Sequence, residues 1–246
     1  MHLHAPKPPH SWSDLFREVG VIAVGILLAL AAEQVIEALR WREQVRIAEG
    51  GIKAELREAS ILAHERLIIQ PCLRGQIRVL HDSLAQPGPW AAAPMQMGTL
   101  IRSELPQAYR PPNRLFVADI WKNALVSGVI GHLTADRVAQ LSELYYTINE
   151  LDRLQGEETR AASRLAAMSE AGDASRDTRI GLRGDLAEID RINVLMALIA
   201  QELIEAQRNP HRQYDKAAIE KDRMEMLTYD RAARGACVAD LPLDLG

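Results

Sequence analysis

The sequence predicts an all-α protein in which an N-terminal transmembrane helix continues into an antiparallel helical bundle. The first observation behind this prediction is the run from Val19 to Ala32, which holds fourteen consecutive residues without a charged side chain. The second is that apolar residues recur at three- and four-residue spacing in several later segments. The third is a low aromatic content of 4%. Helices need few aromatic residues, whereas strand cores draw on aromatic and β-branched side chains.

The apolar run reaches membrane-crossing length when it is extended to Leu39. Residues 19–39 then supply the 20 or so residues needed for about 30 Å of hydrocarbon, although two acidic residues fall inside the segment. Trp12 and Phe16 precede the run and Trp41 follows it, as aromatic residues at membrane interfaces do. A helix from Trp12 to Trp41 would be roughly 43 Å long, close to the thickness of a bilayer with its headgroups.

Four residues inside or near the span lie on one stripe of the predicted helix. Gly25, Ala29, Glu33 and Glu37 follow each other at four-residue spacing. Small residues let two helices approach closely, and polar groups in lipid seek partners. The stripe therefore indicates a contact face toward a second copy, in a homo-oligomer, or toward another membrane protein. The alternative is that both acids lie at the membrane boundary, where Arg40 is an i+3 partner for Glu37.

Two other interpretations of the opening segment stay open. Ala29-Leu30-Ala31 fits the small-x-small pattern of signal-peptide cleavage, but the region before the run has no net positive charge. A buried helix of a soluble protein would also be apolar. The side of the membrane is open as well, because basic residues flank the run at both ends and long domains can be translocated despite them.

The remaining chain predicts a bundle over residues 40–234, after a tail at 1–18 and the transmembrane helix at 19–39. In the first part of the chain, helices are expected at 43–70, from Pro71 to about residue 86, and at 115–127. In the second part they are expected from the N-cap Thr134 to about residue 171, at 177–207 and at 214–234. A Pro-rich connection at 87–113 separates the second and third, and 235–246 form a C-terminal tail. The helix at 177–207 has the clearest apolar seam, with Asn193 as its one polar member. A turn at Gly172 makes the last two long helices neighbours.

Charge and cysteine content exclude several classes of protein. A net charge of −4 provides no excess of basic residues to attract the phosphates of nucleic acid, so no nucleic-acid partner is expected. Cys72 and Cys237 are too few for a disulfide-rich scaffold or a four-cysteine zinc site. Two separate free thiols in a helical core are the simpler expectation, and one long-range disulfide in an oxidising compartment is the alternative.

We find no motif that identifies catalytic chemistry. The seven histidines form neither HExxH nor a di-iron Glu-x-x-His arrangement, and no phosphate loop, dinucleotide fingerprint or nucleophile elbow is present. No cofactor, metal or catalytic residue is therefore expected. The acidic pair Glu157-Glu158 is interpreted as solvated helix surface, and Trp121, Tyr145 and Tyr146 as packing residues rather than a ligand pocket.

Two stretches resemble a broad group of uncharacterised bacterial single-pass membrane proteins. One is FREVGVIAVGILLALAAEQVIEALRWREQV, and the other is IWKNALVSGVIGHLTADRVAQLSELYYTINEL, residues 120–151. The resemblance implies a bacterial inner-membrane protein with a helical extramembrane domain, and it brings no catalytic residues. We therefore expect a membrane-anchored protein, not an enzyme, that contacts the lipid bilayer and acts through protein–protein interaction or self-assembly. The alternative is a membrane-tethered sensor that binds a small ligand in its bundle.

Overall fold

The regular structure of the chain is almost entirely helical, which confirms the all-α prediction. A computed structural model describes residues 12–93, 108–173, 175–208 and 214–245. Within these ranges the only β-type pairing is an isolated bridge between Trp90 and Gly172. The α-helices are α1 (Trp12–Ile68), α2 (Gln70–Ala85), α3 (Asp119–Val126), α4 (Ala135–Arg164), α5 (Arg176–Gln207) and α6 (Lys216–Arg234), with short 3-10 helices η1 (Val129–His132), η2 (Ala166–Ser169) and η3 (Gly235–Cys237).

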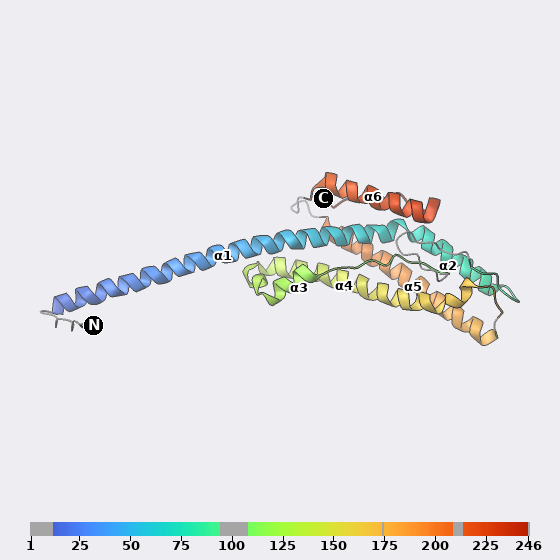
Figure 1. Cartoon of the computed structure of the whole chain (residues 1–246), viewed down its shortest axis with the longest axis horizontal. Coiled ribbons are helices and arrows are strands. Elements are labelled where there is room, and N and C mark those ends of the chain that lie inside the picture. Colours follow the sequence, from blue (N-terminus) through green and yellow to red (C-terminus); the bar gives the residue numbers. More distant parts are fainter. Residues whose placement is uncertain (1–11, 94–107, 174, 209–213, 246) are drawn as a thin grey trace, which may run out of the picture.

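Helix α1 has 57 residues and is about 85 Å long at 1.5 Å per residue. Its N-terminal half projects beyond the bundle, and its C-terminal half packs inside it (Figure 1). Gly50 and Gly51 do not interrupt the helix. At Gly51 a Cβ atom would lie 3.0 Å from Ile120 Cγ2, so the missing side chain lets α3 approach α1 closely.

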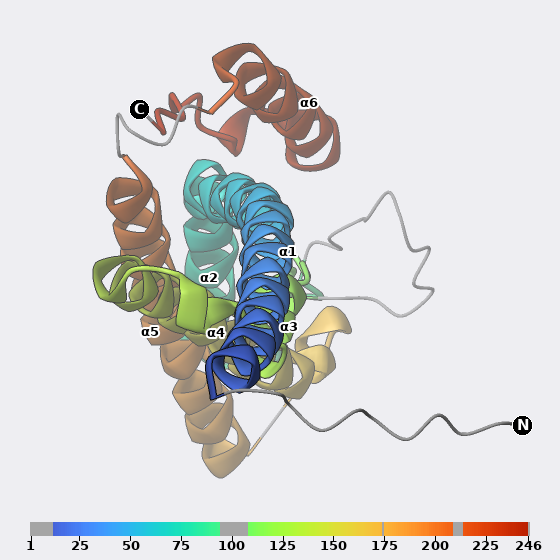
Figure 2. The same cartoon turned by 90° about the vertical axis from the view of Figure 1, so that its left-hand side faces the viewer.

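The bundle is built on contacts among α1, α4 and α5. Helix α5 runs antiparallel to both α1 and α4 and packs against each of them (Figure 1). The predicted adjacency of the last two long helices is thus confirmed. Helix α6 lies on the outer side of α1, away from α4 (Figures 1 and 2). One apolar cluster surrounds Ile52, Tyr145 and Met196, and a second surrounds Leu73, Leu165 and Ile189 farther from the N-terminus.

Helices α1 and α2 are separated by a break at Ile69, as the position of Pro71 predicts. Proline has no N–H for the helical ladder, and Pro71 lies in the first turn of α2, where that loss is tolerated. The backbone N–H of Ile69 donates to Glu65 O at 3.1 Å and that of Leu73 to Ile69 O at 3.1 Å. Backbone hydrogen bonds therefore continue on both sides of the bend, and Leu73, Ile77, Leu80 and Leu84 are all buried.

The third helix is shorter than predicted, because it begins at Asp119 and not at Leu115. The segment before it is non-helical and its backbone is held by side chains. The N–H of Arg114 donates to Gln155 Oε1 at 3.0 Å, and the Glu55 carboxylate accepts from the N–H groups of Ile120 and Trp121 at 3.1 and 3.3 Å. Residues 94–107 of the predicted Pro-rich connection lie outside the described residues.

Helix α4 also ends earlier than predicted, at Arg164 instead of near residue 171. Its predicted N-cap is confirmed, since the Thr134 side chain accepts a hydrogen bond from the N–H of Arg137. The turn at Gly172 exchanges two backbone hydrogen bonds with Trp90, of 2.8 and 3.1 Å. A Cβ atom at Gly172 would lie 3.0 Å from the Trp90 ring, so packing of this indole requires glycine there.

The expectation of two free thiols is wrong, because Cys72 and Cys237 form a disulfide across 165 residues of sequence. The bond joins the first turn of α2 to η3, just after α6, with Cα atoms 5.0 Å apart. The spacing of two distant cysteines could not reveal this pairing. The C-terminal segment beyond it packs on the bundle: Ala239 N–H donates to Ile68 O at 2.8 Å, and Leu245 is buried.

Candidate membrane segment and buried polar cluster

The apolar N-terminal half of α1 has no protein cover in the described structure. Every residue from Phe16 to Arg40 is exposed, whereas the core begins at Ile52 on the same helix. Contiguous apolar surface of this extent on a soluble monomer marks an interaction site or a membrane segment. The chain thus has one helix, among the described residues, that is long and apolar enough to cross a membrane.

The four residues of the predicted contact stripe, Gly25, Ala29, Glu33 and Glu37, are all exposed on this segment. A Cβ atom at Gly25 would meet nothing within 4 Å. The side-chain partner of Glu37 is Trp41, and not Arg40 as considered from the sequence: Trp41 Nε1 donates to Glu37 Oε1 at 3.4 Å. The structure therefore leaves the stripe open along its length and ties its last member to an aromatic side chain.

The three predicted interfacial aromatics lie at the two ends of this exposed segment. Trp12 and Phe16 are highly exposed and their ring centroids are 6.5 Å apart. Trp41 differs from them because it is partly buried and stacks on His132 with a centroid separation of 4.1 Å. Trp41 is thus the point where the free part of α1 first meets the bundle.

A buried ion pair lies at the centre of the bundle and joins α1 to α4. Arg66 donates to both carboxylate oxygens of Glu158, at 2.8 and 2.7 Å, and the two side chains are 2% and 0% exposed. Our interpretation of Glu158 as solvated helix surface is therefore wrong, although Glu157 beside it is partly exposed and pairs with Arg153. Charge-assisted, two-point pairing of this kind offsets part of the desolvation cost of burying both groups, while Arg66 Nε is buried without a hydrogen-bond partner among the described residues.

Two neutral side chains complete this cluster. The Tyr109 hydroxyl donates to Glu158 Oε1 at 2.6 Å, and Asn193 Nδ2 donates to the Tyr109 oxygen at 3.0 Å. Asn193 was the one polar residue of the predicted α5 seam, and the structure buries it completely. Burial and the adjacent carboxylate raise the pKa of Tyr109, so its hydroxyl stays a donor.

The sequence contains a signal for this cluster in the spacing of two helix faces. The buried face of α1 continues from Ala59 through Ala63 to Arg66, at four- and three-residue spacing. The face of α4 continues in the same way from Leu151 through Gln155 to Glu158. A basic and an acidic residue at seam positions of two helices predict a buried pair, once those helices are known to be neighbours.

A second group of ionisable side chains lies under α6 and the C-terminal segment. Arg114 binds the buried Glu65 carboxylate at distances down to 2.6 Å. Burial, followed by the nearby charge of Glu65, raises the pKa of Asp230 to about 6. Burial, followed by the charge of Arg223, lowers the pKa of His64 to about 4. His64 is therefore neutral at pH 7, while Asp230 carries a carboxylate that burial disfavours.

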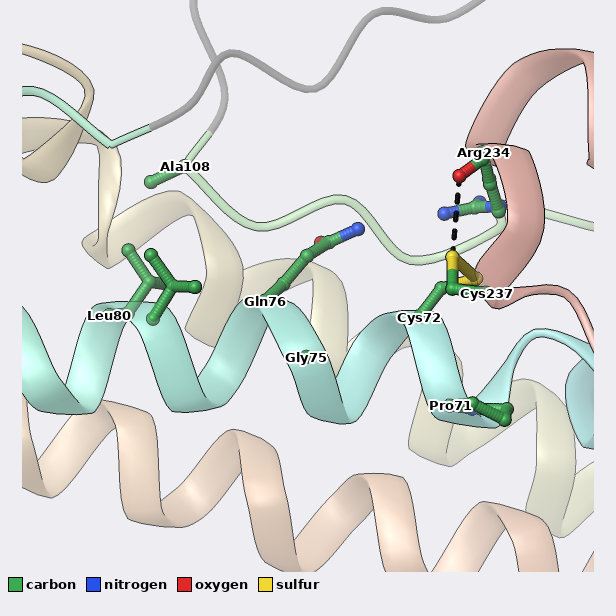
Figure 3. Close-up of a pocket in the computed structure, with 9 residues that line it drawn as sticks. Pro71, Cys72, Gly75, Gln76, Leu80, Ala108, Arg234 and Cys237 are labelled. Carbon is green, nitrogen blue, oxygen red and sulfur yellow. Dashed lines mark hydrogen bonds between the residues drawn. A yellow bond between two sulfur atoms is a disulfide. The ribbon is translucent and has the colours of Figure 1, made fainter.

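A small pocket lies beside the disulfide, between α2 and the chain that follows α6 (Figure 3). Its volume is about 280 Å³, and its lining includes Gly75, Gln76, Leu80, Ala108 and Arg234 together with both cysteines. Arg234 and Gln76 also bind the backbone of Arg110. No cluster of metal-ligating side chains occurs in the described ranges.

The three aromatic residues that we interpreted as packing residues differ in their surroundings. Trp121 and Tyr145 stack in the core, with ring centroids 5.1 Å apart, whereas Tyr146 is exposed to solvent.

Comparison with protein-family models, curated proteins and solved structures finds no match to the chain.

Replacing Glu158 with Gln should destabilise the protein by about 3–5 kcal/mol, because Arg66 would keep a buried charge without a counter-ion. The measurement is chemical unfolding of the full chain in detergent micelles. Glu157→Gln is the matched control: it removes an exposed pair one residue away and should cost less than about 1 kcal/mol. Replacing both partners, by Arg66→Met with Glu158→Leu, should recover part of the loss. Equal costs for Glu157→Gln and Glu158→Gln would contradict the central role of the buried pair.

His64 and Asp230 should affect acid stability in opposite directions. The folded-state pKa of His64, about 4, is below its ordinary value of 6.5, so its contribution to stability is lost as the pH falls from 6.5 toward 4. The folded-state pKa of Asp230, about 6, is above its ordinary value of 3.8, so its contribution is lost as the pH rises through 6. His64→Gln should therefore flatten the fall in Tm between pH 6.5 and 4.

Asp230→Asn should raise stability at pH 7 by on the order of 1 kcal/mol, after allowance for solvent screening, and this gain should vanish near pH 4. Both variants are read by Tm as a function of pH. A parallel shift of the whole Tm curve, with its shape unchanged, would show that neither group titrates as described.

Proposed function

We propose that the chain is a single-pass membrane protein, anchored by residues 19–39 of α1, whose bundle acts by contact with another protein or with a second copy. The observation that carries this proposal is the uncovered apolar half of α1, followed on the same helix by a C-terminal half that packs one face into the core. The resemblance to bacterial single-pass proteins favours the bacterial inner membrane as its location.

The balance of transfer free energies supports insertion of the segment. Residues 19–39 contain eleven Val, Leu and Ile side chains, and each is favourable by roughly 0.3–0.6 kcal/mol at the centre of a span. A charged residue at the centre costs roughly 2.5–3.5 kcal/mol. Glu33 lies four residues beyond the midpoint Ala29, or about 6 Å along the axis, and Glu37 about 12 Å. Both acids are therefore displaced from the most costly depth toward the surface.

The disulfide favours an orientation with the bundle outside the cytoplasm. Disulfides persist in oxidising compartments and are rare in a reducing cytoplasm. The basic residues that follow the span favour the opposite orientation. However, long domains can be translocated in spite of positive charge. We give more weight to the disulfide, and place the N-terminus in the cytoplasm.

The first test is fractionation of bacterial cells that produce the full chain with a C-terminal tag. We expect full-size protein in the carbonate-washed membrane pellet, and loss of the bundle when intact spheroplasts are treated with protease. Leu27→Arg, which adds a charge near the centre of the span, should reduce retention, whereas Val194→Arg on the exposed surface of α5 should not. A shortened soluble product would instead identify Ala29-Leu30-Ala31 as a cleavage site and exclude the anchor.

The contact stripe predicts an effect of Gly25→Leu on association in the membrane. The added side chain would separate helices that pack through this face, and we expect association to weaken roughly tenfold, equivalent to about 1.4 kcal/mol. Energy transfer between labelled copies in vesicles measures it. Ala23→Leu adds similar bulk on another face of the helix and is the control. Equal association of both variants and the unaltered chain would remove the stripe as an interface.

A ligand-binding sensor is a second candidate, favoured by the pocket beside the disulfide. Thermal stabilisation by a metabolite, lost in Gly75→Leu, would support it, because a Cβ atom at Gly75 meets nothing within 4 Å and a larger side chain has room to fill the pocket. Stabilisation that persists in Gly75→Leu would place the ligand elsewhere.

A further inference from the structure

We propose that the bundle has a second membrane contact, in which the tip formed by the end of α3 and by η1, residues 125–132, seats on the bilayer surface beside α1. This inference rests on the proposed anchor. It goes beyond the anchor because it assigns a membrane-binding surface to a segment about 90 residues farther along the chain. The occupant of this surface is the bilayer that α1 crosses.

The stack of His132 on Trp41 sets the height of the tip. Trp41 lies two residues beyond the end of the proposed span, which is about 3 Å along a helix axis. The headgroup region on each side of the hydrocarbon is roughly 5–7 Å thick. His132, whose ring centroid is 4.1 Å from that of Trp41, therefore lies at headgroup level. Figure 1 shows α3 and the start of α4 at the end of the bundle that faces the free half of α1.

Contacts farther along α1 fix the direction in which this part of the bundle points. Ile120 of α3 packs on Gly51, and Arg137 of α4 lies 3.8 Å from the Glu49 carboxylate. Both contacts are on the bundle side of the Trp41–His132 stack. Helix α1 is continuous from Trp41 through Glu49 to Gly51. The tip therefore cannot move away from the membrane surface without breaking its contacts with these three residues.

The side chains of the tip suit a lipid surface. Val126 is 90% exposed, the highest value for a large apolar side chain in the described ranges, and Leu125 beside it is 51% exposed. Gly128 turns the chain with a φ of 77°, which leaves both side chains at the turn. An apolar pair that remains in water loses hydrophobic stabilisation, and insertion among lipid headgroups and upper acyl chains recovers it.

The junction between the tip and α1 adds polar groups that suit headgroups. A hollow of about 530 Å³ is lined by Trp41, His132, Arg42, Glu37 and Gln34. Arg42 is a donor for lipid phosphate, and the Trp41 indole is amphipathic, as side chains at membrane interfaces commonly are. Apolar side chains at the tip, beside a hollow that combines polar side chains with the apolar Ala38 and Val45, are the arrangement of a surface that rests in an interface.

The test uses the full chain in phosphatidylcholine vesicles, with an environment-sensitive fluorophore on a single added cysteine. Both native cysteines are occupied in the disulfide, so Val126→Cys is labelled alone after the bond has been verified on a non-reducing gel. We expect blue-shifted emission and strong quenching by lipids that carry a headgroup spin label. The matched control is Val79→Cys on α2, which is 49% exposed at the other end of the bundle and should be neither shifted nor quenched.

A third label separates failure of this inference from failure of the anchor. Ile26→Cys, within the proposed span, should be quenched by spin labels on the acyl chains. Quenching at Ile26 without quenching at Val126 would overturn the seated tip and keep the anchor, whereas no quenching at either would overturn both.

A second set of variants tests whether the apolar pair holds the tip. With the label on Ser127→Cys, the additional changes Leu125→Ser and Val126→Ser should abolish most of the quenching, because both side chains are exposed and their replacement leaves the core intact. Quenching that is unchanged in this variant would overturn the assignment of Leu125 and Val126 as the membrane contact.

Discussion

The rest of the structure depends on the continuity of α1, which is one helix from Trp12 to Ile68. Its two halves have different surroundings, because the first is uncovered and apolar and the second forms a wall of the core. A helix has no free rotation between its halves. The direction in which the N-terminal half leaves the bundle is therefore set by the same register that places Ile52, Leu56 and Ala59 in the core. In the membrane orientation that we propose, the same register sets the face that the bundle turns toward the bilayer.

The buried pair of Arg66 and Glu158 holds that register. Apolar seams tolerate small shifts between helices, whereas two parallel hydrogen bonds between a guanidinium and a carboxylate form only in one alignment. Tyr109 and Asn193 extend the same constraint to the non-helical segment before α3 and to α5. The disulfide then fixes the far end, where α2 and the chain after α6 meet. We infer that the polar cluster contributes more to a single alignment of the helices than to the free energy of unfolding.

Much of this fold could be predicted from the sequence because helix periodicity and helix breakers are local. Thr134 and Pro71 act within a few residues of their own positions, and the structure uses both of them as predicted. The errors concern interactions between distant parts of the chain. The pairing of Cys72 with Cys237, the burial of Glu158, and the late start of α3 under Glu55 all depend on which helices become neighbours. Local sequence patterns do not contain that information.

The central claim is that α1 carries a disulfide-closed bundle on the oxidising side of a membrane. The most direct measurement is a two-step labelling of intact spheroplasts prepared from cells that produce the full chain. A membrane-impermeant phosphine reductant is followed by an impermeant maleimide polymer, and the chain is resolved by gel electrophoresis. The account predicts two added polymers per chain after reduction and none without it. Labelling without reduction, or labelling only after the spheroplasts are lysed, would contradict it, because the cysteines would then be free thiols or would face the cytoplasm.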